Sequence, residues 1–142
     1  MKLLEIHTAM NMPYLFGKYD CFRLAELVAR VNLYSVQYPS EWPWHSEAAI
    51  LKKAKKDFPS IPKAYETWLQ QCASAEQATT RVIGGVAVYP AECKIGDAHI
   101  MKIPFIAICM DDGFDYAYSN MGLQKVAEGV PLSYWNWPCL LQ

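Results

Sequence analysis

The pattern of apolar residues changes near residue 80, and this change constrains the fold more than any other feature. Before it, apolar residues recur at helical spacing in residues 21–33, 46–56 and 62–72, after a short amphipathic segment near the N-terminus. After it, short runs rich in β-forming residues alternate with Gly, Pro, Asn and Asp turns. These runs are residues 81–89, 98–103, 105–110, 114–118, 123–126 and 132–137. Connections this short leave no room for crossover helices, which predicts a mainly antiparallel sheet.

The order of these elements predicts an α+β fold in which N-terminal helices pack on a mainly antiparallel five- to six-stranded sheet. The chain has 142 residues and is 53% apolar, which is enough for one core. We therefore expect a single domain over residues 1–142, with a helical half at 1–80 and a sheet half at 81–142.

Charge and hydropathy exclude several classes of function. The formal net charge of −1 argues against a sequence-independent nucleic-acid binder, which needs a basic field. No apolar run approaches the roughly 18–20 residues that span a bilayer. The first residues do not have the charge pattern of a secretory signal, so we expect synthesis and folding in a cytoplasm.

The cysteines do not form a metal or disulfide framework. There are five, Cys21, Cys72, Cys93, Cys109 and Cys139, and no two of them form a CxxC pair. The odd number and irregular spacing predict that most are small buried hydrophobic residues. The segment 111–113, Asp-Asp-Gly, lacks the ligand spacing of a calcium loop and is predicted to be a hairpin turn. We predict no metal and no cofactor.

Cys21 is the cysteine whose sequence context favours chemical reactivity. Asp20 has the right chemistry for a helix N-cap, which places Cys21 at the start of the strongest helix signal in the chain. Free backbone N–H groups at a helix N-terminus stabilise a thiolate. Cys21 also lies on the apolar stripe of this helix with Leu24, Ala25 and Val28, where it would be an inert core residue. Both interpretations remain open from the chemistry alone.

Residues 13–25, Pro-Tyr-Leu-Phe-Gly-Lys-Tyr-Asp-Cys-Phe-Arg-Leu-Ala, resemble the P-[FY]-x-[WF]-G-x-x-D-C segment of NlpC/P60-like papain-fold proteins. They are most similar to the small members encoded among phage tail genes. In that family the cysteine that begins the helix is the nucleophile of a peptidase that cuts peptidoglycan stem peptides. The sheet half, with Gly96-Asp97 and the later hairpins, follows the family pattern less specifically. The resemblance implies a papain-like fold of NlpC/P60 type, with Cys21 at the nucleophile position.

The chain departs from this family at the catalytic base. Alignment of residues 106–108 with the family's Val-Gly-Ile places Phe105 where the catalytic histidine should be. Phenylalanine cannot accept a proton, and proton transfer of this kind contributes about 10²–10⁴ in rate. A family member without the histidine should be a poor peptidase or none.

Other residues of the chain are candidates to replace the missing catalytic histidine and the group that orients it. If the strand begins instead at His99, that imidazole becomes the candidate base for Cys21. Asn120 is a weak candidate for the group that orients the base, as are the hydroxyl groups of Tyr116 and Tyr118. The remaining histidines, His7 and His45, are expected in surface segments.

Aromatic clusters form the second set of candidate functional residues. Trp42, Trp44, Trp135 and Trp137 are predicted either to pack in the core or to form an interface, since tryptophan is enriched at binding hot spots. The lysines within residues 52–56 are predicted to form a solvated helix face.

Two functions follow from the resemblance. In the first, the protein is a catalytically degenerate structural or assembly component at a phage tail tip, in the virion, with other tail proteins as partners. In the second, it is an active cysteine peptidase or amidase that cleaves peptidoglycan peptides, with Cys21 as nucleophile and His99 as base. Phe105 favours the first function, and the intact Asp20-Cys21 pair favours the second.

Overall fold

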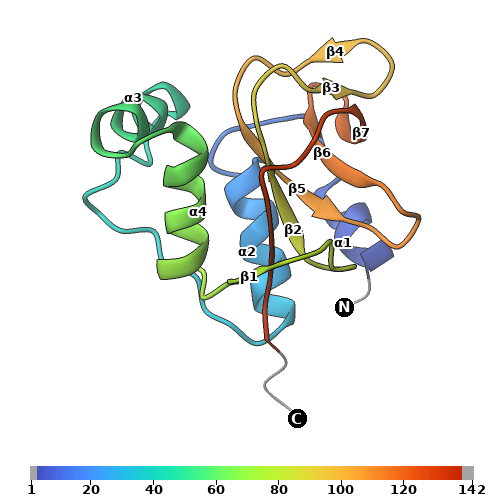
Figure 1. Cartoon of the computed structure of the whole chain (residues 1–142), viewed down its shortest axis with the longest axis horizontal. Helices are drawn as coiled ribbons and strands as arrows, with labels where there is room; N and C mark the ends of the chain where they lie inside the picture. Colours follow the sequence, from blue (N-terminus) through green and yellow to red (C-terminus); the bar gives the residue numbers. More distant parts are fainter. Residues whose placement is uncertain (1–2, 139–142) are drawn as a thin grey trace.

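The computed structural model describes residues 3–138, which form four helices and one antiparallel sheet of eight strands (Figure 1). The helices are α1 (Leu3–Met10), α2 (Cys21–Val31), α3 (Glu47–Asp57) and α4 (Ile61–Gln71). The side chains of Asp20, Ser46 and Ser60 each accept a hydrogen bond from a backbone N–H in the first turn of the following helix. These caps explain why the three longer helices begin within about two residues of the predicted positions.

The strands are β1 (Glu76–Ala78), β2 (Val86–Tyr89), β3 (Lys94–Ile95), β4 (His99–Ile100), β5 (Phe105–Cys109), β6 (Asp115–Ser119), β7 (Gly122–Glu128) and β8 (Ser133–Asn136). Their order across the sheet is β1-β8-β2-β5-β6-β7-β3-β4. Every pairing between neighbouring strands is antiparallel. Each of the six predicted runs overlaps one of these strands, and β1 and β3 are additional.

This architecture corrects the predicted fold. The α+β class is compatible with the structure, but a five- to six-stranded papain-like sheet of NlpC/P60 type is wrong. The sheet has eight strands, and its combination with four helices is not recognisably papain-like. The prediction missed β1 and β3 because they are only three and two residues long, which is too short to produce a strand pattern in the sequence. β1 also lies before residue 81, inside the half that was predicted to be helical.

Two apolar clusters cover the two faces of the sheet. Alternate residues of β5 point to opposite faces, so Ile106 and Ile108 belong to the cluster beneath the helices, and Phe105, Ala107 and Cys109 belong to the other. This second cluster also contains Ile95 of β3, although two strands, β6 and β7, separate β3 from β5 in the sheet order. The β3–β4 end must therefore curve over the far face of the central strands, as Figure 1 shows at the top of the view.

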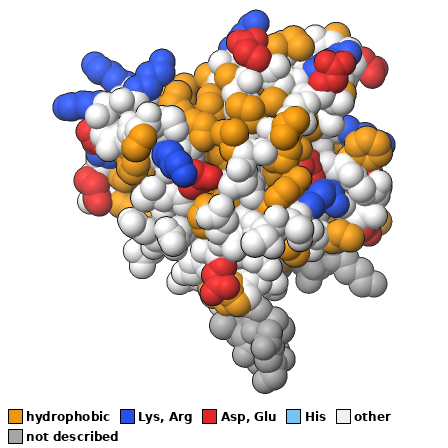
Figure 2. Space-filling view, viewed as in Figure 1, with side chains coloured by type: hydrophobic (Ala, Val, Ile, Leu, Met, Phe, Trp, Pro, Cys, Tyr) orange, Lys and Arg blue, Asp and Glu red, His pale blue; other side chains and the backbone are white. Residues whose placement is uncertain are grey.

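Within the described part of the chain, no helix is both long and apolar enough to cross a membrane. The lysines of α3 gather at one end of the molecule (Figure 2). Lys53 forms an ion pair with Asp57 at 2.7 Å, and Lys52, Lys55 and Lys56 are exposed.

Candidate functional site

The start of α2 is fixed by a buried carboxylate. Asp20 is 3% exposed; its Oδ1 accepts a hydrogen bond from the Arg23 backbone N–H at 2.8 Å, and its Oδ2 accepts one from the Gly17 N–H at 2.6 Å. Gly17 has a φ of +89°, a conformation that glycine adopts without steric cost. These bonds place Cys21 at the first position of α2, and α2 packs against β5.

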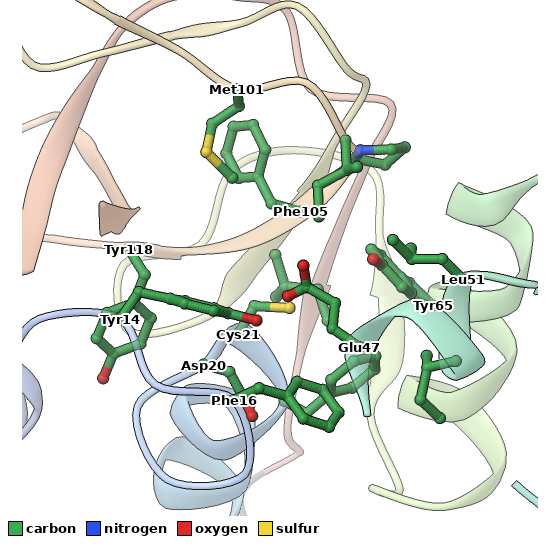
Figure 3. A pocket seen from close by; sticks show the side chains of 15 residues that line it. Tyr14, Phe16, Asp20, Cys21, Glu47, Leu51, Tyr65, Met101, Phe105 and Tyr118 are labelled. Carbon is green, nitrogen blue, oxygen red and sulfur yellow. The ribbon is translucent and has the colours of Figure 1, made fainter. Parts of the chain in front are cut away.

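Cys21 lines a small cavity between α2, α3, α4 and the segment 101–106 (Figure 3). The cavity has a volume of about 30 Å³, which is room for about two water molecules. Most of the lining is apolar and includes Phe16, Leu51 and Met101. Figure 2 shows apolar side chains gathered between α3 and the β3–β4 end of the molecule. A peptide substrate would not fit into this volume without movement of the walls.

The cavity disfavours the reactive form of Cys21. Burial, followed by the negative charge of Asp20, raises the pKa of the Cys21 thiol to about 12. Backbone groups of Ile106, Cys21 and Phe22 act in the opposite direction, but their effect on this pKa is smaller. The helix N-terminus therefore does not offset desolvation, and the thiol stays protonated at neutral pH.

None of the described residues that line the cavity is a histidine. Phe105 is at the rim, across from Cys21 and beside Met101 in Figure 3, and its ring stacks on Tyr89 with centroids 5.1 Å apart. His99 is exposed on the edge strand β4 and does not line the cavity, so the structure does not bring the candidate base to Cys21. His7 packs edge-on against Tyr116, and His45 is exposed in the loop before α3.

Of the residues predicted to orient the catalytic base, only some line the Cys21 cavity. Asn120 is exposed in the β6–β7 turn and lies outside the cavity. Tyr116 donates its hydroxyl hydrogen bond to Asp112 at 2.6 Å, also outside the cavity. Tyr118 does line the cavity, where burial, with smaller contributions from Asp20, Tyr19 and Cys21, raises its pKa.

The tryptophans predicted as binding residues lie mainly in the core. Trp42, Trp135 and Trp137 are all less than 9% exposed, and Trp44 is partly exposed and stacks on Trp42 with centroids 5.5 Å apart. The indole N–H of Trp137 donates to the Ala73 carbonyl at 2.7 Å. The burial of these rings leaves little surface for a partner. Among the other cysteines, Cys93 and Cys109 are buried and Cys72 is partly buried; Cys139 lies outside the described residues.

Glu47 and Tyr14 also line the cavity, and neither was predicted as a site residue, although Tyr14 lies in the segment 13–25 before Cys21. Glu47 is the first residue of α3, where an acidic residue is expected for the helix dipole alone, so its position carries no separate signal. Tyr14 is brought beside Tyr118 by a hydrogen bond from its backbone N–H to the Ser119 carbonyl at 3.2 Å. Only the folded arrangement reveals that these residues surround Cys21.

Comparisons with protein-family models, with curated proteins and with solved structures find no match to this chain. The site is therefore interpreted from its own geometry, and no family is assigned.

Proposed function

We propose that this protein is a non-catalytic structural or assembly component of a phage tail, in the tail-tip region of the virion. The non-catalytic part rests on one observation: Cys21 lies in a cavity whose described lining includes no histidine, and burial raises the pKa of its thiol to about 12. The phage-tail part rests on the resemblance of residues 13–25 to small phage-tail proteins of the NlpC/P60 group. The same resemblance supports synthesis in the bacterial host cytoplasm and contact with other tail proteins.

The geometry does not favour the alternative of an active peptidase. A cysteine nucleophile needs a base within about 2.6–3.2 Å or a lowered pKa, together with an acid for the leaving amine. The candidate base His99 is exposed on an edge strand and is not among the residues around Cys21. The cavity volume of about 30 Å³ also excludes a stem peptide in this conformation.

The first test measures peptidase activity and thiol reactivity together. The purified protein is incubated with peptidoglycan, and peptides released by it and by the Cys21→Ala variant are compared by mass spectrometry. In parallel, iodoacetamide labelling of Cys21 is followed from pH 5 to 10. A shift of the thiol pKa from 9.0 to about 12 predicts about 10³-fold less thiolate at pH 7 than in the unfolded chain.

We expect no peptide release that depends on Cys21, and labelling that accelerates only in alkaline solution. Labelling of the same chain in denaturant is the control for intrinsic thiol reactivity. A labelling rate that reaches a plateau below pH 7, or peptide release lost in Cys21→Ala, would show a working nucleophile and overturn the proposal.

A second test addresses the tail. In the phage or prophage that encodes the chain, Cys21→Ala should leave tail assembly and plating efficiency unchanged, whereas deletion of the chain should abolish intact tails in electron micrographs. Normal tails and infectivity after deletion would contradict a structural or assembly role.

A further inference from the structure

Glu47 is a carboxylate without a protein partner beside the Cys21 cavity. It lines the cavity from the first turn of α3, is partly buried, and forms no hydrogen bond or ion pair with any described residue. Burial alone raises its pKa. A carboxylate held in partly apolar surroundings loses hydration, and a ligand that replaces the lost water hydrogen bonds would stabilise it.

Two hydroxyl groups in the same cavity also lack partners. The Oη atoms of Tyr14 and Tyr118 are fully buried and form no hydrogen bond with any described residue. Tyr118 is only 4% exposed, so its hydroxyl cannot turn to bulk water. In Figure 3 these tyrosines lie on one side of Cys21, and Glu47 and Tyr65 lie on the other. Unpaired buried hydroxyl groups are rare in folded proteins. In Figure 3 the hydroxyl group of one of the two tyrosines ends beside Cys21, on the same space as Glu47, and the other points away from it.

The charge and shape of the cavity define the ligand. Among the described residues that line it, Asp20 and Glu47 are acidic and none is a lysine, arginine or histidine. Asp20 already accepts two backbone hydrogen bonds, which leaves Glu47 as the free acidic group. The walls toward the rim are apolar, with Leu51, Ile103 and Met101. Because the cavity holds about 30 Å³, only a head group of roughly one to two water molecules in size can enter.

We propose that this cavity binds a primary ammonium group on an unbranched apolar stem. The ammonium donates hydrogen bonds to the Glu47 carboxylate and to the tyrosine hydroxyl group that ends beside Cys21, and the stem packs against the apolar rim. This inference rests on the proposed function, since it gives a non-catalytic protein a binding role for the cavity around an inert cysteine. A lysine side chain of another tail protein and a free alkylamine share this chemistry.

The test titrates the full chain with n-butylammonium chloride and with n-butanol, a neutral molecule of similar shape, and records backbone amide NMR shifts. We expect saturable shifts near Cys21, Glu47 and Tyr118 with butylammonium and none with butanol. Glu47→Gln keeps the side-chain shape and should weaken binding at least tenfold, because hydrogen bonds to charged groups contribute about 1.5–3 kcal/mol. Tyr14→Phe and Tyr118→Phe each remove an unpaired hydroxyl group and should fold normally. The variant that removes the hydroxyl group beside Cys21 should weaken binding severalfold, and the other variant should bind as the parent does.

Glu41→Gln is the matched control, because Glu41 is exposed and lies outside the cavity. An acetyl-Gly-Lys-Gly-amide peptide separates the two ligand sources: binding tighter than that of butylammonium identifies a partner's lysine, and weaker binding identifies a free amine. Equal shifts with butanol and butylammonium, or full affinity in Glu47→Gln, would overturn the inference. Neither result bears on peptide release by Cys21, so failure here is distinguishable from failure of the non-catalytic proposal.

Discussion

Asp20 both positions Cys21 and suppresses its reactivity. Its two carboxylate oxygens hold the Gly17 and Arg23 amides, which fixes the residue where α2 begins. The same negative charge is the second cause of the raised Cys21 pKa, after burial. A single side chain therefore builds the helix start that could favour a thiolate and also disfavours that thiolate electrostatically.

We expect Asp20→Ala to lower the free energy of unfolding by about 1–3 kcal/mol, because it removes an N-cap and leaves the Gly17 amide unpaired. Urea denaturation followed by circular dichroism measures the change. Ser46→Ala is the comparison, since it removes only one cap bond, of 3.1 Å, from α3. If Asp20→Ala costs no more than Ser46→Ala, the second hydrogen bond of Asp20 contributes nothing.

At the scale of helices and strands, the sequence predicts an element only where residues within or next to that element mark it. The bounds of α2, α3 and α4 follow from Asp20, Ser46 and Ser60, whose capping chemistry is visible in the sequence. β1 and β3 have no such signal, because a strand of two or three residues is defined by its partner rather than by its own pattern.

One buried cluster ties the β5–β6 hairpin to β2. Asp115 on β6 is 6% exposed; it accepts a hydrogen bond from the Tyr89 hydroxyl and one from Arg81 Nε at 2.8 Å. Arg81 Nη2 also donates to the carbonyls of Met110 and Phe114 at 2.7 and 2.9 Å. The cluster therefore joins the segment before β2, β2 itself and the hairpin that follows β5.

We expect Asp115→Ala to lower the free energy of unfolding by about 2–3 kcal/mol, because Arg81 and Tyr89 lose a charged partner in a buried position. Glu92→Ala is the control: its ion pair with Lys102, at 3.6 Å, is exposed and should contribute less than about 1 kcal/mol. Equal midpoints of urea unfolding for the two variants would contradict a structural role for this cluster.

At the scale of the whole molecule, only part of the cavity lining could be predicted from the sequence. The sequence singled out Cys21, which lies in the segment 13–25 with its recognisable pattern, and Phe105 through a less specific alignment of the sheet half. It did not indicate Glu47, Tyr65 or Met101, which come from α3, α4 and the segment after β4. These residues meet through tertiary packing, and no spacing in the chain encodes their meeting.

The fold as a whole should lose stability in alkaline solution. Burial raises the pKa of Cys21 to about 12 and also raises those of Cys109, Tyr89 and Tyr118. Each group deprotonates at a lower pH in the unfolded chain than in the folded chain. Stability is therefore complete below about pH 9 and falls as the pH rises toward the folded-state values.

The Cys21→Ser variant tests how much the Cys21 thiol contributes to this loss of stability in alkaline solution. Between pH 8 and 10.5, the parent protein should lose about 1–2 kcal/mol more unfolding free energy than the variant, because serine does not titrate in this range. Urea unfolding at both pH values gives the difference. Parallel losses in the two proteins would mean that the Cys21 pKa is not raised by folding.

The position of β8 has a consequence for how the protein is made. β8 lies between β1 and β2 and pairs with both, although it comes last in sequence among the described strands. The ribosome synthesises β1 and β2 well before residues 133–136. Until β8 is made, the edges of β1 and β2 that pair with it have no partner strand. A chain interrupted before residue 133 would keep the edge of β2 open, and an open edge can recruit a strand from another molecule. Premature termination should therefore convert this protein into an aggregation-prone fragment rather than a slightly shorter fold.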